Sequence, residues 1–246
     1  MVEVAPVNDN ITLEQLNLDP YPIYQRLRRE SPVLRVNATG RTLLTKAADT
    51  QYVKGMPELF SSNDPNTPME RAFWAQTLMR KDGDEHRRER MSMAGAFNPK
   101  VIEREWIPAY RKIAEEYVSR LPRGEIVDLF PALSGPYSAR GLAVILGMSE
   151  ASDEDMQRWS QTLIDGAGNF GCLDEPFAAS DRTNLEVHAL LDNLQARHKA
   201  YPNNSAFALM INASDPIAQK QIYANIKIAI GGGINEPRDS INTVVY

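Results

Sequence analysis

The chain has 246 residues, one cysteine and a formal net charge of -5. A single cysteine cannot close a disulfide within the chain, so disulfide-built scaffolds and metal sites made of four cysteines are excluded. The acidic balance argues against a nucleic-acid binder, since such proteins carry a basic stripe. The sequence shows neither a secretory leader nor an apolar run of about 20 residues. We therefore expect a cytoplasmic protein with no membrane or nucleic-acid partner.

The elements predicted along the chain are mainly helical. Residues 1–20 are polar and irregular, and we expect an extended arm. Within residues 21–60, hydrophobic spacing and turn residues predict a short helix, a β-hairpin and a second helix, at 22–30, 33–45 and 47–56. Residues 61–246 open with a loop rich in Ser, Asn, Asp and Pro, and then follow a helical pattern at 106–121, 137–146, 156–164, 182–199 and 217–246. The predicted fold class is mainly α with a small N-terminal β-sheet.

The segment Asp82–Arg90 concentrates charged side chains near a predicted helix start. His86 and Arg90 are four residues apart, so both project from one helical face. Two such donors suit an anionic ligand with carboxylates or phosphates. The alternative is a solvated helix with ordinary i, i+4 charge pairs, which these residues considered alone favour. A zinc site is not expected, because no second histidine lies four residues away.

The glycines Gly231–Gly233 interrupt an apolar helical pattern near the end of the sequence. Each glycine costs about 1 kcal/mol relative to alanine in a helix, and the close approach of a flat ligand is one reason for that cost. Pro237 has no N–H for the carbonyl of Gly233, so the helix should kink there. The freed carbonyl and the Glu236 carboxylate suit a small polar ligand or a proton relay.

Two alternatives stay open for this glycine segment. The glycines can simply end one helix, with Asn-Glu-Pro at residues 235–237 starting another. A phosphate loop is the second alternative, but the segment lacks the lysine and the hydroxyl residue that such a loop needs.

In this order, the segments resemble a bacterial cytochrome P450. The resemblance begins at residues 19–33 (DPYPIYQRLRRESPV) and includes residues 58–62 (ELFSS), the segment Asp82–Arg90 and residues 97–100 (FNPK). It ends at Ile230–Glu236, which resembles the long central helix over the haem. The match covers essentially the whole chain and implies that residues 1–246 are the N-terminal part of a single P450 domain.

The resemblance implies a haem b cofactor and assigns roles around it. His86 and Arg90 match the pair that holds the haem propionates, and Gly232 and Gly233 match the small residues that let the central helix lie against the haem. The positions of Asn235 and Glu236 usually carry an acid followed by a threonine. Glu236 would therefore take over proton delivery from the usual hydroxyl, either protonated or through water. This Gly-Gly-Ile-Asn-Glu-Pro variant is similar to that of aromatic O-demethylases and of P450s fused to their reductase.

The same resemblance points to substrate-binding residues in the loop before the haem-edge helix, in the Cys172 region and in the central helix. These candidates are Phe73, Trp74, Leu78, Met79, Ile164, Phe170 and Ile228. Together they suggest a compact apolar pocket with aromatic walls, although each one alone is as easily explained as ordinary core.

The implied function is a haem-thiolate monooxygenase. It would hydroxylate or O-demethylate a small apolar substrate, with a methoxylated aromatic as the specific expectation. The reaction would consume O2 and two electrons. The electrons would come from a ferredoxin or a flavoprotein reductase, separate or fused. The alternative is a non-enzymatic helical protein that binds a ligand or regulates another protein and lacks haem.

The family's iron-binding cysteine loop, Phe-x-x-Gly-x-x-x-Cys-x-Gly, is missing from the sequence. Cys172 precedes the central helix, and we expect it to be a small, partly buried or pocket residue rather than an iron ligand. The chain stops at Tyr246 in an apolar stretch that carries no capping glycine or polar tail. We therefore expect no metal ligand among these residues and a chain truncated before the haem-ligand loop.

Overall fold

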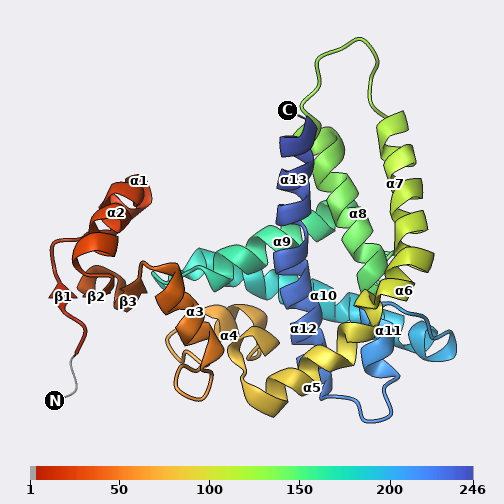
Figure 1. Ribbon diagram of the computed structural model, residues 1–246. Helices are drawn as coiled ribbons and strands as arrows, with labels where there is room; N and C mark the ends of the chain where they lie inside the picture. Colours follow the sequence, from red (N-terminus) through yellow and green to blue (C-terminus); the bar gives the residue numbers. More distant parts are fainter. Residues whose placement is uncertain (1–3, 246) are drawn as a thin grey trace. The chain divides into compact units, whose positions relative to one another are not determined.

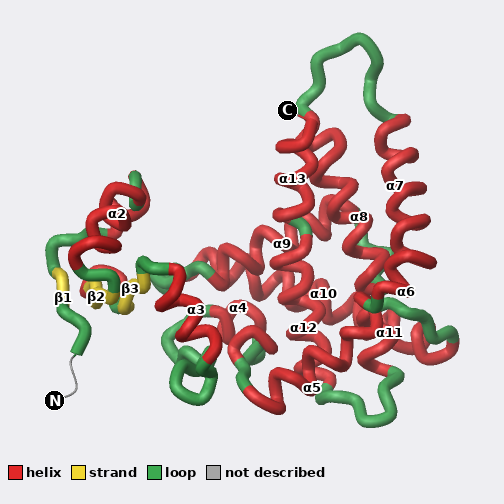
Figure 2. The backbone as a smooth tube through the Cα atoms, in the orientation of Figure 1, coloured by secondary structure: helices red, strands yellow, loops and turns green. Residues whose placement is uncertain are grey.

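The computed structural model describes residues 4–245, which form mostly helices and one three-stranded sheet (Figure 1, Figure 2). The chain divides into two compact units between Ser61 and Ser62. This division falls next to the predicted boundary between residues 21–60 and 61–246; that both belong to a single domain stays a prediction. Among the described residues, no helix is long and apolar enough to cross a membrane.

The first unit is a small sheet with short helices. Its elements are β1 Val7–Asn8, α1 Leu13–Leu18, α2 Tyr21–Glu30, β2 Val33–Val36, β3 Arg41–Leu44 and α3 Ala47–Gly55. β1 pairs in parallel with β2, and β2 pairs antiparallel with β3. Gly40, with a φ of 62°, closes the turn between β2 and β3, a left-handed conformation that glycine adopts without strain. The predicted helix, hairpin and second helix are confirmed.

The prediction of an irregular arm over residues 1–20 is wrong for the part that the structure describes. Thr12 caps α1 by accepting the Gln15 N–H, and the Gln15 side chain accepts the Thr12 N–H in return. This capping box satisfies two backbone donors that a short helix otherwise leaves unpaired. Ile11 is only 2% exposed and belongs to the core of this unit, so the segment is anchored by apolar burial as well. Residues 1–3 lie outside the described residues.

The second unit is helical and is organised around α9. In chain order its helices are α4 Met69–Phe73, α5 Gly83–Ala94, α6 Pro99–Val101, α7 Ile107–Ser119, α8 Gly135–Leu146, α9 Asp153–Ala167, α10 Asp174–Ala200, α11 Ala206–Ile211, α12 Gln219–Gly233 and α13 Asn235–Val245. α9 contacts α4, α8, α10 and α12 (Figure 1). Leu146, Met156, Leu163, Leu191 and Ile226 are fully buried in the core that these helices share.

The last predicted helix, residues 217–246, is two helices over its described part. α12 ends at Gly233, Ile234 forms a bend with a φ of -103°, and α13 begins at Asn235. Pro237 has no N–H for the Gly233 carbonyl, which gives the break its physical cause. The Ile234 carbonyl accepts hydrogen bonds from the Ser138 hydroxyl at 2.7 Å and from the Arg238 N–H at 3.1 Å. The structure thus has the alternative in which the glycines end one helix and Asn-Glu-Pro starts another.

Candidate functional site

α5 has one buried and one accessible face. Its Glu89 is 3% exposed, whereas His86 is half-buried and Arg90 is exposed. Within residues 4–245, the side chains of His86 and Arg90 make no hydrogen bond or ion pair. Asp82 stands at the N-cap of this helix, but its carboxylate accepts the Ser62 N–H instead of an amide of α5. The accessible face of α5 therefore carries the two predicted donors without partners in the described part of the chain.

The buried face of α5 is tied to α12 through a chain of polar contacts. Lys81 Nζ lies 2.5 Å from Glu89 Oε1 and 2.5 Å from Glu85 Oε1. Asn225 Nδ2 of α12 donates to Glu89 Oε2 at 2.9 Å, and Asn225 Oδ1 accepts the Leu78 N–H at 3.3 Å. Burial alone lowers the pKa of Lys81, but its hydrogen bonds to the two glutamates raise the pKa above the ordinary value. These contacts fix α12 against α5 and the turn before it.

A second buried polar cluster surrounds Lys227 of α12, which is 1% exposed. Lys227 Nζ donates to the Phe73 carbonyl at 2.6 Å and to the Asn184 side chain, and it lies 3.0 Å from His188 Nε2. The same ammonium lies 5.8 Å from the centre of the Trp74 ring. Trp74 has a φ of 56°, an uncommon conformation for a bulky residue. Lys227 thus holds the carbonyl that directly precedes this left-handed turn.

The charges of this cluster are shifted by burial. Burial and the charge of Lys220 lower the pKa of Lys227 to about 7. Burial and the charge of Lys227 lower the pKa of His188 to about 4. Because His188 is neutral at pH 7, its Nε2 can accept a hydrogen bond from Lys227 when Nδ1 carries the proton.

The three glycines of α12 have different surroundings. A Cβ placed on Gly231 would meet Phe73 Cζ at 3.6 Å and Ile164 Cγ1 at 3.8 Å. A Cβ on Gly233 would meet Leu142 at 3.0 Å, so close packing alone accounts for this glycine. Gly232 is exposed, and a Cβ there would meet no atom of the described chain within 4 Å. Gly232 is therefore the glycine that leaves helix surface open to a ligand.

The predicted substrate-binding residues separate into buried, half-buried and exposed positions. Phe73 and Ile164 meet at Gly231, where Phe73 is 1% and Ile164 is 37% exposed. Leu78 is buried, and Trp74 and Ile228 are half-buried. Met79 and Phe170 are exposed, in the turn before α5 and in the turn after α9. The structure brings Phe73, Ile164 and the start of the glycine segment together, and it does not place Met79 or Phe170 in contact with Gly231.

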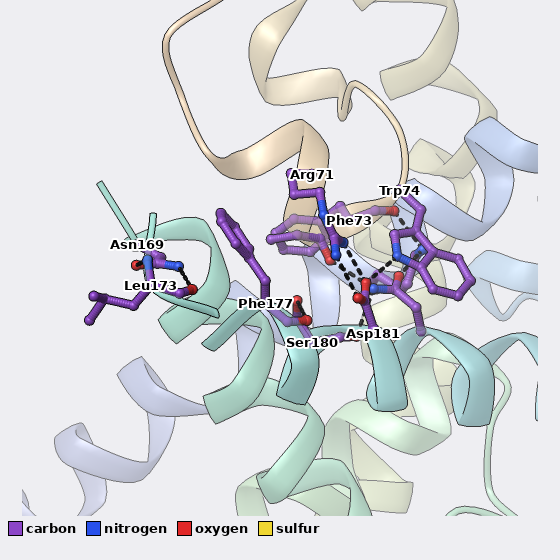
Figure 3. A network of polar contacts seen from close by, with 11 residues as sticks. Arg71, Phe73, Trp74, Asn169, Leu173, Phe177, Ser180 and Asp181 are labelled. Atoms are coloured by element: carbon purple, nitrogen blue, oxygen red, sulfur yellow. Dashed lines mark hydrogen bonds and ion pairs between the residues drawn. The ribbon is translucent and has the colours of Figure 1, made fainter. Parts of the chain in front are cut away.

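The expectation that Cys172 is partly buried or faces a pocket is wrong. Cys172 is exposed and has a φ of 52°, in a tight turn between α9 and α10. Asn169 holds this turn, because its side chain accepts the Leu173 N–H at 3.0 Å and donates to the Leu173 carbonyl at 2.7 Å (Figure 3). The left-handed geometry of the turn, which the sequence does not reveal, accounts for the exposed thiol.

A polar network on α4 and α10 was not predicted from the sequence. Arg71 binds Asp181 through both guanidinium nitrogens, at 2.5 and 2.6 Å, and Trp74 Nε1 donates to the same carboxylate at 2.6 Å (Figure 3). The hydrogen bond from Arg71 lowers the pKa of Asp181 below its ordinary value. The Arg71 guanidinium also lies 5.2 Å from the centre of the Phe177 ring. Trp74 is thereby fixed on two sides, by Asp181 and by the Lys227 cluster.

A pocket of about 720 Å³ opens beside this network. Its lining residues are Asn63, Asp64, Pro65, Thr67, Glu70, Arg71, Trp74, Gln76 and Arg80. Of the predicted substrate-binding residues, Trp74 lines this pocket. The remaining lining residues are mostly polar, in contrast to the apolar pocket expected from the sequence.

Sequence reasoning also missed Asn225 and Lys227. A signal was present, because both are polar residues inside the otherwise apolar stretch Ile222–Ile230. Their partners are 39 to 154 residues away in the chain, so no local pattern identifies them.

Comparisons with curated proteins give bacterial relatives of low identity. The chain is 24% identical over 204 residues to Cytochrome P450 109 of Bacillus spizizenii, a match that covers 81% of this chain and 48% of that protein. It is 25% identical over 249 residues to Linalool 8-monooxygenase of Pseudomonas putida, covering 92% of this chain and 60% of that protein. The chain thus spans about half to three-fifths of the length of these two relatives. No protein-family profile matches it.

Solved structures show the same fold. The chain matches Mycobacterium marinum cytochrome P450 CYP268A2, in complex with pseudoionone, with a TM-score of 0.76, 22% identity, and coverage of 94% of this chain and 60% of that one. It matches P450BioI, in complex with an acyl carrier protein, with a TM-score of 0.74, 15% identity, and coverage of 95% and 62%. The mainly helical fold with a small sheet, predicted from the sequence, is confirmed. The chain is a relative of the bacterial cytochrome P450s and has the fold of that family over the part that it spans.

Proposed function

We propose that the chain is the N-terminal part of a haem-thiolate monooxygenase of bacterial cytoplasm. The observation that carries this proposal is the accessible face of α5, where His86 and Arg90 have no partner within the described chain. Hydrogen-bond donors that have no carboxylate partner are suited to an anionic group such as the haem propionates. The opposite face of the same helix is tied through Glu89 to α12, so the pair has a fixed relation to the glycine segment.

The residues present fit haem b as a cofactor. His86 and Arg90 would bind its propionates by charge-assisted hydrogen bonds, and Gly232 would leave room for its flat face. When bound, haem supplies the chemistry that activates O2. The protein's contribution is to hold the cofactor, exclude water and position protons and substrate.

Glu236 is the residue proposed to hold and deliver a proton. It is exposed in the first turn of α13, next to the half-buried Asn235. Its carboxyl oxygens can donate a proton when protonated, or relay one through water, in place of the hydroxyl usual at this position. The break at Ile234 sets Glu236 at the start of a new helix rather than within a continuous one.

We expect Glu236→Ala to lower the ratio of product formed to electrons consumed, because reducing equivalents are lost when the proton is not delivered. Asp239→Ala is the matched control, since Asp239 is another exposed acid of α13. The measurement is product yield against NAD(P)H consumption in the reconstituted protein. Unchanged coupling in the Glu236 variant would remove this residue from proton delivery.

The proposed substrate is a small apolar molecule, with a methoxylated aromatic as the specific candidate. Phe73 and Ile164, which both lie beside Gly231, support apolar surroundings for the glycine segment. The likeness of the Asn235-Glu236-Pro237 variant to O-demethylating P450s supports the methoxy group. Electrons would come from a ferredoxin or a flavoprotein reductase.

The decisive experiment is a ferrous–CO difference spectrum of the protein in its natural length. A thiolate-type Soret band is expected, together with less bound haem per protein in the double variant His86→Ala/Arg90→Ala. Arg87→Ala is the control, because Arg87 lies on α5 but pairs with Asp84. Absence of the band would overturn the proposal and favour a non-enzymatic ligand-binding protein.

A further inference from the structure

Arg80 stands out in the polar pocket because its guanidinium has no partner among the described residues. Its Nε atom is buried and has no hydrogen-bond acceptor, and the side chain forms no ion pair within residues 4–245. Arginine stays charged at all relevant pH values, so it cannot relieve this situation by losing a proton. A buried, unpaired donor of a cation is costly, and an incoming anion removes that cost.

The backbone of Arg80 is held from two sides. Its N–H donates to the Thr77 carbonyl at 2.9 Å, and its carbonyl accepts from Gln76 Nε2 at 3.0 Å. The same Gln76 nitrogen donates to Asn63 Oδ1 at 2.9 Å. The turn is further anchored to α12 through the bond between the Leu78 N–H and Asn225. The backbone from which the Arg80 side chain projects is therefore fixed at the pocket.

The other charges of the pocket limit the charge of its ligand. The charge of Arg71 is already balanced by Asp181, to which it binds through two hydrogen bonds. Asp64 has an interaction of its own, and Glu70 is exposed, where water solvates it. A single uncompensated guanidinium remains, which suits a monoanion better than a doubly charged phosphate.

The rest of the pocket indicates what such an anion is attached to. A volume of about 720 Å³ is in the range of sites for small organic molecules. The Trp74 indole and the Pro65 ring give the lining its apolar surface. The indole cannot swing away easily, because Asp181 accepts its N–H at 2.6 Å. The lining thus combines the aromatic surface of Trp74 with the guanidinium of Arg80.

We propose that this pocket binds the carboxylate of an otherwise apolar organic acid, which pairs with Arg80 while its apolar body lies against Trp74. The inference rests on the proposed function, since this acid would be the substrate of the monooxygenase. A planar carboxylate matches the fork of a guanidinium with two parallel hydrogen bonds. Arg80 is then the residue that selects acids over neutral analogues of the same size.

The test compares acids with their neutral esters on the protein in its natural length. The probes are para-methoxybenzoate and octanoate, each beside its methyl ester. Binding is followed by tryptophan fluorescence, to which Trp74 contributes, and by the Soret shift of the haem-loaded protein. A charge-assisted pair predicts that at least one acid binds about tenfold or more tightly than its ester.

Arg80→Gln should abolish this preference, because it weakens the binding of the acid and leaves the binding of the ester unchanged. Arg111→Gln, at an exposed position of α7, should leave the preference intact. If Arg80→Gln does not fold, Arg80→Lys replaces it, because lysine keeps the charge but lacks the paired donors of the guanidinium. The acid is then expected to bind several-fold more weakly.

Two results would overturn the inference: acids and esters that bind equally, or a preference that survives loss of Arg80. Neither result affects the proposed function as long as the ferrous–CO spectrum shows a thiolate band. Conversely, a preference for acids by fluorescence in a protein without that band would reject the monooxygenase and keep the carboxylate site.

Discussion

The two ends of α12 differ in what surrounds them. Every residue from Tyr223 to Lys227 is buried, and the polar members Asn225 and Lys227 are bonded to other elements. From Gly231 to Pro237 the chain carries three glycines, a helix break and an exposed carboxylate. The same segment thus passes from a part that is fully engaged with the protein to a part with free surface.

This difference shows that α12 is held by its buried half, whereas the side chains of the open end, Gly231–Pro237, make no hydrogen bond to another helix among the described residues. The buried half is bonded through its side chains to α5, to the turn before it, to the end of α4 and to α10. Between Gly231 and Ile234 the side-chain hydrogen bonds from other helices reach the backbone: Ser160 donates to the Gly231 carbonyl and Ser138 to the Ile234 carbonyl, while the Ile234 side chain packs in the core. The exposed Glu236 side chain remains available for chemistry.

The largest expected effect on stability comes from removing the Glu89 carboxylate, which binds the buried half of α12. Glu89→Leu leaves Asn225 Nδ2 without an acceptor and leaves Lys81, whose side chain is 3% exposed, with Glu85 as its one carboxylate partner among residues 4–245. Removing one partner of a buried ion pair costs about 3–5 kcal/mol. Urea denaturation should show this loss in the free energy of unfolding.

Glu85→Leu is the matched control for Glu89. Both carboxylates bind Lys81 at 2.5 Å, but the Glu85 side chain is 66% exposed. An exposed pair contributes about 1 kcal/mol or less. Equal losses in the two variants would contradict the view that the buried half holds the helix.

The second prediction concerns the pH dependence of stability through Lys227. Its pKa is about 7 in the folded chain and 10.5 in the unfolded one. Between these values the unfolded chain binds a proton that the folded chain does not. The free energy of unfolding therefore rises with pH over this window, by at most about 1.4 kcal/mol per pH unit. Below pH 7 both states are protonated and the burial penalty is fully present.

Lys227→Met should remove this rise, which is measured as the difference between the stability–pH curves of the variant and the native chain. His188 titrates near pH 4, and Tyr223 has its pKa raised by burial and by its bond to Asp192, so both cancel in this difference over most of the window. Lys199→Met, at an exposed position of α10, is the control and should keep the rise. A rise of equal slope in the Lys227 variant would assign it to other groups.

Much of the fold follows from local signals in the sequence. Pro22 lies in the first turn of α2, and Pro32 follows its end. Pro237, which has no N–H, predicts the break before α13. The His86 and Arg90 pair is also local, since two residues four apart on a helix must share a face. α1 carried a local signal as well, in Thr12 and Gln15, but the polar composition around it favoured an arm.

The rest depends on contacts that are distant in the chain. Lys227 and Phe73 are 154 residues apart, and Asn225 and Glu89 are 136 apart. A buried polar residue requires a partner, but its sequence neighbours do not say which one. Arg80 is the same problem in reverse, because its significance lies in the partner that the described chain does not provide.

The smallest expected effects come from Gly232 and Gly233, which separate packing from ligand access at the open end. Gly233→Ala would press a methyl group on Leu142 at 3.0 Å, and such overpacking costs about 1–3 kcal/mol, partly offset by the better helix propensity of alanine. Gly232→Ala meets open space and should stabilise the chain by about 0.5–1 kcal/mol.

The amount of haem bound should rank the Gly232 and Gly233 variants differently from their stability. Gly232→Ala places a methyl group on the surface proposed to face the cofactor, so the more stable variant should retain less haem per protein than Gly233→Ala. Thermal unfolding and the haem-to-protein absorbance ratio measure the two quantities on the same samples. If Gly232→Ala retained its haem fully, the open surface at Gly232 would have no part in cofactor binding, and packing on Leu142 would account for Gly233 alone.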